Sequence, residues 1–315
     1  MPTTAHTQAP TAPADPTTPA APRALAAAAV TALFVPGDRP ERFRKATASE
    51  ADIVIIDLED AVAPEAKTDA LRAVLDHLAP GADPVRALVR LNAEGAATLA
   101  AELGSLADLA ARPGHGLLGV VVPKAENPNA LRDIAAAFAA VAGPPLALVA
   151  LIESAVGVQN AAELARVPGV TRLAFGAIDY ALDINAGPGD RVLDYARSAI
   201  VVASRAAGLN GPLDSPSVQI SDPELVAESA RLARQFGFGG KLCIHPAQLR
   251  PVVAAFRPSA AEVDWARSVI RATGGAAQVN GQMIDRPVTV RAERILRLHE
   301  AAPDTRSGAS APTDQ

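Results

Sequence analysis

Two acidic residues, Glu153 and Asp179, have the setting of a paired carboxylate site. Glu153 directly follows an apolar run, and Asp179 comes shortly after a second run, 173–175, which breaks at Gly176. A helical pattern at 156–167 separates the two runs. In a parallel sheet such a strand–helix–strand unit brings the ends of both strands to one edge, so both carboxylates are expected there.

Two neighbouring carboxylates repel each other unless a cation lies between them. Oxygen ligands suit a hard divalent ion, and a site with two carboxylates that keeps several waters suits Mg²⁺ best. The alternative is that Glu153 caps the helix starting near Ser154 while Asp179 lies in a polar turn. The paired placement favours the magnesium site.

The elements that must position this pair alternate regularly between strand and helix. Seven apolar runs and one weaker run predict buried parallel strands at 31–35, 53–58, 87–91, 117–122, 146–152, 173–175, 211–213 and 242–244. Helical patterns separate them at 41–48, 65–78, 96–109, 130–141, 156–167, 192–207 and 223–236. This order is typical of a (β/α)₈ TIM barrel. An open doubly wound sheet is the competing fold, but no glycine fingerprint for a dinucleotide follows any strand.

Charged and polar residues follow the predicted strands, as the active-site face of a barrel requires. Desolvating such groups costs free energy, so their gathering at one mouth indicates function. A solvated-surface interpretation stays open for Lys124 and Asp214. The residues at these strand ends are Asp57, Glu59, Asp60, Arg90, Asn92, Lys124, Glu153, Asp179, Asp214 and His245.

The chain continues past the barrel, which we assign to residues 23–257. Ser259 and Glu262 form a capping-box pattern that predicts a helix start, and a last helix follows a glycine-rich segment. We assign 258–302 to a small C-terminal helical lid. The segments 1–22 and 303–315 have the composition of disordered tails.

Composition excludes several classes of protein. The 315 residues carry a net charge of −5 with both signs dispersed, so nucleic acid is not an expected partner. No apolar run reaches the length of a membrane span. The single cysteine, Cys243, excludes an internal disulfide and agrees with a cytoplasmic location.

Several motifs resemble the citrate lyase beta subunit-like proteins of the aldolase/citrate lyase family, also called HpcH/HpaI or CoA-ester lyases. The resemblance implies a TIM barrel with a C-terminal lid, assembled as a homotrimer or a multiple of one. It also implies Mg²⁺-dependent cleavage or formation of a carbon–carbon bond next to a CoA thioester. The motifs, in chain order, are LFVPGDRPERFRKA, DIVIIDLEDAVAPEAK, VRLN, VVVPKAENP, ALIESAVGVQNAAELA, LAFGAIDYALD, GGKLCIHPAQL and GQMIDRPV.

The resemblance also implies roles for individual residues. Glu153 and Asp179 match the two metal carboxylates, and Arg90 matches the arginine that holds the keto-acid end of the substrate. Asp57, Glu59 and Asp60 match an acidic cluster in which at least one residue holds metal-bound water or orients Arg90. Lys45 lies where relatives contact a CoA phosphate, and Asp285 matches an acid/base aspartate that the lid of one subunit inserts into a neighbour's site. The implied catalytic set is Asp285, Arg90 and Glu59, and the implied substrate-binding set is Arg90, Lys45, Asp57 and Asp60.

The expected reaction converts a 3-hydroxyacyl-CoA, such as citryl-, malyl- or citramalyl-CoA, into a keto acid and acetyl-CoA or a related acyl-CoA, or runs in reverse. Three alternatives stay open: an aldolase acting on free 4-hydroxy-2-keto acids, a malyl-CoA-type thioesterase, and a catalytically silent CoA-binding protein. The segment GQMIDRP favours a CoA ester as substrate.

Overall fold

The computed structural model describes residues 21–139, 141, 143–187, 189–272, 278–279 and 282–300. Nearly all of the predicted tails therefore lie outside the described residues. Eight parallel strands form a closed barrel in which each strand pairs with its neighbours in chain order and the last pairs with the first. The predicted TIM barrel is confirmed. The strands are β1 (Thr31–Pro36), β2 (Ile53–Asp57), β3 (Ala87–Arg90), β4 (Leu117–Val122), β5 (Ala147–Ile152), β6 (Val170–Phe175), β7 (Leu213–Asp214) and β8 (Gly240–Cys243).

The strands are apolar on both faces because both faces are buried. One hydrophobic cluster fills the barrel interior and includes Ile55, Val149 and Leu242. A second, larger cluster lies between the strands and the surrounding helices and includes Ile56 and Phe175. Alternate residues along each strand therefore belong to different clusters, as the two-residue repeat of a strand requires.

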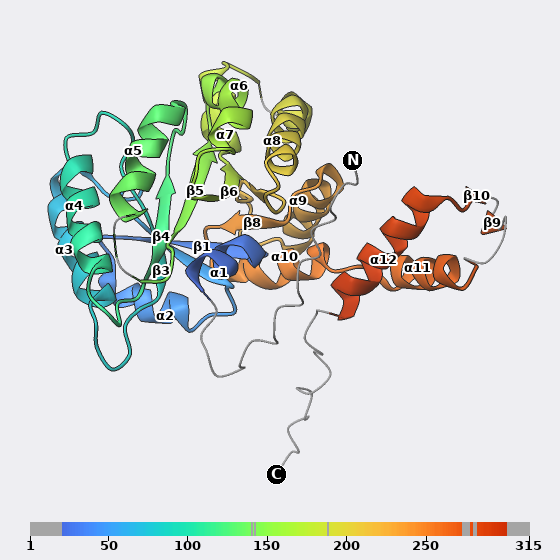
Figure 1. Cartoon of the computed structure of the whole chain (residues 1–315), viewed down its shortest axis with the longest axis horizontal. Coiled ribbons are helices and arrows are strands. Elements are labelled where there is room, and N and C mark those ends of the chain that lie inside the picture. Colours follow the sequence, from blue (N-terminus) through green and yellow to red (C-terminus); the bar gives the residue numbers. More distant parts are fainter. Residues whose placement is uncertain are drawn as a thin grey trace, which may run out of the picture.

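Helices surround the barrel (Figure 1). Each one that packs on the strands turns an apolar stripe inward; in α3, for example, Ala70, Val74 and Leu78 are buried. The helices are α2 (Phe43–Thr47), α3 (Lys67–Leu78), α4 (Leu99–Ala110), α5 (Pro128–Ala139), α6 (Ala155–Leu164), α7 (Ala177–Asp183), α8 (Asp194–Ala206), α9 (Pro223–Phe236) and α10 (Leu249–Phe256).

The main differences from the sequence prediction are two additional helices and the start of one strand. Residues 22–28 form a helix, α1 (Pro22–Ala28), which was not among the predicted helices. A second helix that was not predicted, α7, contains Asp179, so the alternative that this residue lies in a polar turn is wrong. Strand β6 begins three residues earlier than predicted, because Arg172 interrupts its apolar pattern although the side chain is buried.

Arg172 joins α1 to the strands of the barrel. Its guanidinium donates hydrogen bonds to the carbonyl oxygens of Ala26 (3.0 Å), Ala29 and Gly211 (2.8 Å). Burial lowers the pKa of Arg172 to about 10, and the charge of Asp52 opposes that shift. The side chain is therefore still protonated at neutral pH and satisfies carbonyls that would otherwise be buried without partners.

The C-terminal helices form a hairpin that we call the arm, residues 260–300. It contains α11 (Ala260–Ala272), α12 (Arg286–Glu300) and two short strands, β9 (Gln278–Val279) and β10 (Gln282–Met283). In Figure 1 the arm extends beyond α9 and α10, and its tip, where β9 and β10 lie, points away from the barrel. In the described part of the chain, no helix has both the length and the apolar character of a membrane span.

Replacing Arg172 with alanine should lower the free energy of unfolding by about 2–4 kcal/mol, because buried carbonyl groups lose their donors. Urea-induced unfolding measures the change. Arg72→Ala is the matched control: it removes an exposed pair with Asp69 within α3 and should change stability by less than about 0.5 kcal/mol. Equal effects of the two replacements would contradict the role given to Arg172.

Candidate functional site

A cavity of about 390 Å³ opens at the carboxyl ends of the strands. Charged side chains occupy one part of its wall and apolar side chains the rest, which is the usual character of a small-molecule site. The lining residues are Phe34, Pro36, Asp57, Asp60, Ala61, Arg90, Leu151, Glu153, Gly176, Ile178, Asp179, Ser215, Pro216, Leu242 and Ile244.

Glu153 follows the last residue of β5 and is only 3% exposed. Its Oε1 atom accepts a hydrogen bond of 2.7 Å from the backbone N–H of Lys124. Its other oxygen lies over Gly176, where a Cβ atom would come within 2.5 Å of Oε2. Gly176 is therefore required at the end of β6, because any side chain there would displace the Glu153 carboxylate.

Asp179 lies in the first turn of α7 and is half-buried. Burial raises the pKa of Glu153 to about 8; the hydrogen bond from Lys124 opposes this, and the negative charges of Glu59 and Asp179 add to it. The two carboxylates are thus close enough to repel each other. The capping alternative for Glu153 does not hold, because Ser154 caps α6 by accepting a hydrogen bond from Gly157 N–H.

Arg90 ends β3 directly beside Asp57, its register partner at the end of β2. The Nε and Nη2 atoms of Arg90 donate to the two oxygens of Asp57 at 2.7 and 2.6 Å. Its Nη1 atom lies 3.0 Å from Glu59 and 3.3 Å from Asp60. A guanidinium held on both edges by carboxylates has little freedom to rotate. Asp57 therefore orients Arg90.

Glu59 is buried between two cations. Lys124 donates from Nζ to one carboxylate oxygen at 2.6 Å, and Arg90 approaches the other. Burial raises the pKa of Glu59 in spite of both cations, and the neighbouring Asp60 adds to the rise. The carboxylates near the mouth outnumber the cations, so the region is left with excess negative charge.

Lys124 binds the carboxylates of both Glu153 and Glu59. Its backbone N–H binds Glu153 and its ammonium group binds Glu59. The backbone has a φ of 45°, a left-handed conformation that costs free energy for a residue with a side chain. Lys124 is exposed, as the solvated-surface interpretation expects, yet both of its donors bind carboxylates of the site.

Two residues that hold the loop after β2, Lys67 and Glu102, were not predicted, and neither was the role of Asn92. Lys67 donates from Nζ to the carbonyl oxygens of Leu58 (2.8 Å) and Glu59 (2.9 Å). Asn92 also donates to Leu58 O, and Glu102 accepts hydrogen bonds from the backbone and side-chain amides of Asn92. These contacts join residues from α3, β3 and α4, so spacing along the chain gave no signal for them.

Glu59 does not line this cavity, and two other residues implied by the resemblance lie away from it. Lys45 is exposed in the last turn of α2 and does not line it. Asp285 is exposed at the start of α12, where its Oδ1 accepts a hydrogen bond from Val288 N–H. No described residue of the arm lines the cavity. The arm of this chain therefore does not deliver Asp285 to the mouth of its own barrel.

Asp214 and His245 also lie away from the acidic pair. Asp214 is fully buried and pairs with Lys241 at 2.6 Å, with Arg197 of α8 3.7 Å away. This cluster lies between the strands and α8, so Asp214 is not a surface residue. His245 is exposed and accepts a hydrogen bond from Ala247 N–H through Nδ1.

The acidic pair offers oxygen ligands only. Within the described ranges, no group of three or more histidine, cysteine, aspartate or glutamate side chains has the arrangement of a metal site. The pair can thus supply two ligands, and a bound cation would keep other coordination positions for water or substrate, as Mg²⁺ commonly does. A larger described cavity, of about 1230 Å³, lies between α9, α10 and α12 and contains no comparable acidic pair.

The raised pKa of Glu153 predicts a pH-dependent stability. A carboxyl group that binds its proton more tightly when folded gives stability that is present below its unfolded pKa and is lost as the pH rises through its folded value. Without metal, the free energy of unfolding should therefore fall by about 4 kcal/mol between roughly pH 4.5 and 8 on account of Glu153.

Urea unfolding in EDTA across this pH range measures the effect. Glu153→Gln should remove most of the fall, because glutamine does not titrate, and the exposed Glu94→Gln should leave it unchanged. Parallel pH profiles for wild type and Glu153→Gln would contradict the assignment.

Comparisons with known proteins identify related sequences and structures. The HpcH/HpaI aldolase/citrate lyase family matches residues 31–246. A citrate lyase subunit beta-like protein of Mycobacterium tuberculosis is 38% identical over 275 residues, covering 84% of this chain and 93% of that protein. A (3S)-malyl-CoA thioesterase of Cereibacter sphaeroides is 31% identical over 281 residues, covering 86% and 94%.

A solved structure shares the fold over most of its length. The CitE protein of Mycobacterium tuberculosis, in complex with magnesium, acetoacetate and coenzyme A, superposes with a TM-score of 0.75 at 38% identity, covering 87% of this chain and 99% of that one. The matched family region contains all eight strands and both carboxylates of the acidic pair. The chain belongs to the HpcH/HpaI aldolase/citrate lyase family.

Proposed function

We propose that this protein is a Mg²⁺-dependent carbon–carbon lyase that cleaves or forms a 3-hydroxyacyl-CoA such as citryl-, malyl- or citramalyl-CoA. The observation that supports it most directly is that the buried Glu153 carboxylate, Asp179 and Arg90 line one cavity. The M. tuberculosis relative solved with magnesium, acetoacetate and coenzyme A supports the same class of ligands.

The residues present fit Mg²⁺. Glu153 is kept from ionising by burial and by neighbouring carboxylates, so a divalent cation would stabilise its charged form. Glu153 and Asp179 would hold the ion, with the hydrogen bond from Lys124 N–H fixing one oxygen of Glu153. The bound ion would supply Lewis-acid polarisation of substrate oxygens.

Side chains of this chain would bind the substrate and orient the groups that take part in the reaction. Arg90, oriented by Asp57, would bind the carboxylate of the keto-acid portion through the Nη2–H that Asp57 does not use. In the cleavage direction a base removes the hydroxyl proton, the carbon–carbon bond breaks, and its electron pair passes to the carbon next to the thioester. Protonation of that carbon then gives the acyl-CoA. Glu59, held by Lys124 and Arg90, would keep the guanidinium in place throughout.

We propose that Asp285 of a neighbouring copy is this base. Within one chain the arm contributes no described residue to the cavity, whereas the family resemblance places the aspartate in a neighbour's site. Large apolar side chains stay exposed along α6, α7 and α8, as expected of a surface that another subunit covers. They are Val156, Ile178, Leu182, Ile184, Tyr195 and Val202. A homotrimer or a multiple of one is the expected assembly.

The proposal is tested by incubating the protein with Mg²⁺ and citryl-, malyl- and citramalyl-CoA, and separately with free 4-hydroxy-2-keto acids, while measuring keto acid and free CoA. Keto acid from a CoA ester without CoA release supports the lyase. Keto acid from the free acids alone would indicate an aldolase instead. Binding of CoA with no turnover anywhere would contradict an enzymatic function.

A thioesterase is the second candidate, because a malyl-CoA thioesterase is 31% identical over most of both chains. The same cavity would then position a water molecule to attack the bound thioester, and no base would be needed to remove the hydroxyl proton of the substrate. Release of CoA without keto acid in the panel would assign this activity.

Removing the metal or one of its ligands should abolish turnover. EDTA should stop the reaction and excess Mg²⁺ should restore it, whereas Glu153→Gln should stay inactive at any Mg²⁺ concentration because its amide is a poor ligand. Asp285→Asn should lower kcat at least about 100-fold while leaving Mg²⁺ binding unchanged. Glu94→Gln is the control and should keep wild-type rates. Substantial turnover by Glu153→Gln would contradict the proposed metal site.

Mixing two inactive variants tests whether Asp285 acts between subunits. If a neighbour supplies it, mixed oligomers of Glu153→Gln and Asp285→Asn chains contain some sites with an intact mouth and an intact arm. At equal proportions about a quarter of the wild-type activity should return. Co-expression followed by rate measurement checks this. If each chain used its own Asp285, every site would keep one defect and no activity would return.

A further inference from the structure

The arm has a hydrophobic core of its own. Val263, Ala266 and Val269 of α11 pack against Ala292 and Ile295 of α12. The two clusters of the barrel contain no described residue of the arm. A shared core is therefore not what fixes the direction of the arm relative to the barrel.

The junction between the two bodies is short and open. Helix α10 ends at Phe256, Arg257 is extended with φ −73° and ψ 146°, and α11 begins at Ala260. Beside this junction the cavity of about 1230 Å³ separates α9 and α10 from α12, with Ile295 and Leu298 on the side of the arm. A groove therefore separates α12 of the arm from α9 and α10 of the barrel.

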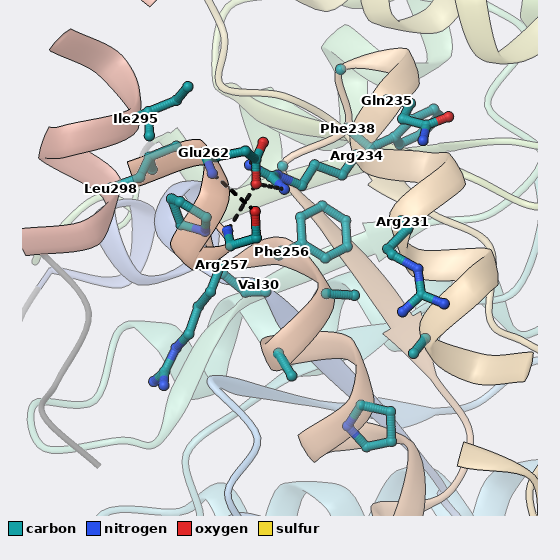
Figure 2. Close-up of a pocket in the computed structure, with 18 of the residues that line it drawn as sticks. Val30, Arg231, Arg234, Gln235, Phe238, Phe256, Arg257, Glu262, Ile295 and Leu298 are labelled. Carbon is teal, nitrogen blue, oxygen red and sulfur yellow. Dashed lines mark hydrogen bonds and ion pairs between the residues drawn. The ribbon is translucent and has the colours of Figure 1, made fainter. Parts of the chain in front are cut away.

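One ion pair crosses the junction (Figure 2). Arg234 of α9 donates from Nη1 and Nη2 to the two oxygens of Glu262 at 3.0 and 2.9 Å. Among the described residues it is the only ion pair between the barrel and the arm. Both side chains are about a quarter to a third exposed, at 25% and 32%, so the pair is partly shielded from water.

Glu262 is held rigidly on the side of the arm. It accepts a hydrogen bond of 2.8 Å from Ser259 N–H, and its own N–H donates to Ser259 Oγ, which completes the predicted capping box. A bidentate arginine–carboxylate contact fixes direction as well as distance. The pair therefore joins the first turn of α11 to the last turn of α9 in one defined orientation.

We propose that Arg234 and Glu262 lock the direction of the arm, and that this lock positions Asp285 for a neighbouring copy. The two residues act as positioning residues, since they lie at the junction and not in the mouth cavity. The first half of the proposal concerns the orientation of the arm alone; the second half rests on the proposed function.

The chain offers a matched control on the same helix. Arg231, one turn before Arg234, pairs with Glu224 at 2.6 Å within α9. Arg231→Ala therefore removes an arginine–glutamate pair of the same helix and leaves the Arg234–Glu262 pair in place. Arg234→Ala is preferred to replacement of Glu262, because it leaves the capping box of α11 intact. The exchanged variant, Arg234→Glu with Glu262→Arg, restores the pair with reversed charges.

Distances between spin labels measure the direction of the arm without reference to activity. Labels are attached to cysteines introduced at the exposed positions Glu228 on α9 and Arg271 on α11, in chains diluted with unlabelled protein. The native Cys243 is buried, and burial raises the pKa of its thiol to about 12, so it does not compete for label. Wild type and Arg231→Ala should give one narrow distribution, Arg234→Ala a broad one, and the exchanged variant a narrow one again.

Turnover tests the link to catalysis. Arg234→Ala should lower kcat about 10- to 100-fold, because a misplaced catalytic group reacts slowly, while the Mg²⁺ concentration for half-maximal rate stays unchanged. The exchanged variant should recover most of the loss. A narrow wild-type distribution in Arg234→Ala would overturn the lock. A broadened distribution with unchanged kcat would overturn its catalytic role, and absence of lyase activity in the wild type would overturn the proposed function while leaving the distance result valid.

Discussion

The central constraint on this structure is the burial of the Glu153 carboxylate beside other carboxylates. Water cannot stabilise its charge at the end of β5, and Glu59 and Asp179 raise the free energy of the ionised form further. One backbone hydrogen bond from Lys124 opposes these effects and does not overcome them. A group in this state is stabilised either by a proton or by a cation, so the mouth of the barrel is prepared for a positive charge.

The surrounding residues hold the Glu153 carboxylate and its neighbours in this buried arrangement. Gly176 leaves space for the Glu153 carboxylate. Lys124 adopts a left-handed backbone conformation in which its N–H donates to that carboxylate. Asp57 holds Arg90 in one orientation, while Lys67 fixes the loop that carries Glu59. Each of these contacts joins neighbouring strand ends or their loops. The closed barrel makes such contacts possible, because it brings all eight strand ends to one rim.

Much of the fold was predictable because buried parallel strands are almost continuously apolar. All eight strands were located this way, and the error at β6 has a clear cause: Arg172 is polar yet buried, since three carbonyl groups surround its guanidinium. Helix α1 was missed because its alanine-rich sequence continues directly into β1. Helix α7 was missed because seven residues give too little periodicity.

The residues of the mouth were predictable only in part. Glu153, Asp179, Asp57 and Arg90 follow strands, and parallel topology alone brings strand ends together. The contacts of Lys67 and of Asn92 with Glu102 depend on which helix packs beside which loop, and the residue spacing does not show this. The two donors of Lys124 depend on a backbone angle that its sequence does not suggest.

The direction of the arm was the least predictable feature, for a physical reason. An amphipathic pattern shows which faces of α11 and α12 meet, and it is satisfied whichever way the hairpin points from the barrel. What remains to select one direction is a short junction and a polar contact that sequence periodicity does not reveal. Non-directional apolar packing would tolerate small rotations at this point, whereas a bidentate ion pair does not. A catalytic group supplied to another subunit requires such directionality, and Arg234 and Glu262 provide it where α11 begins.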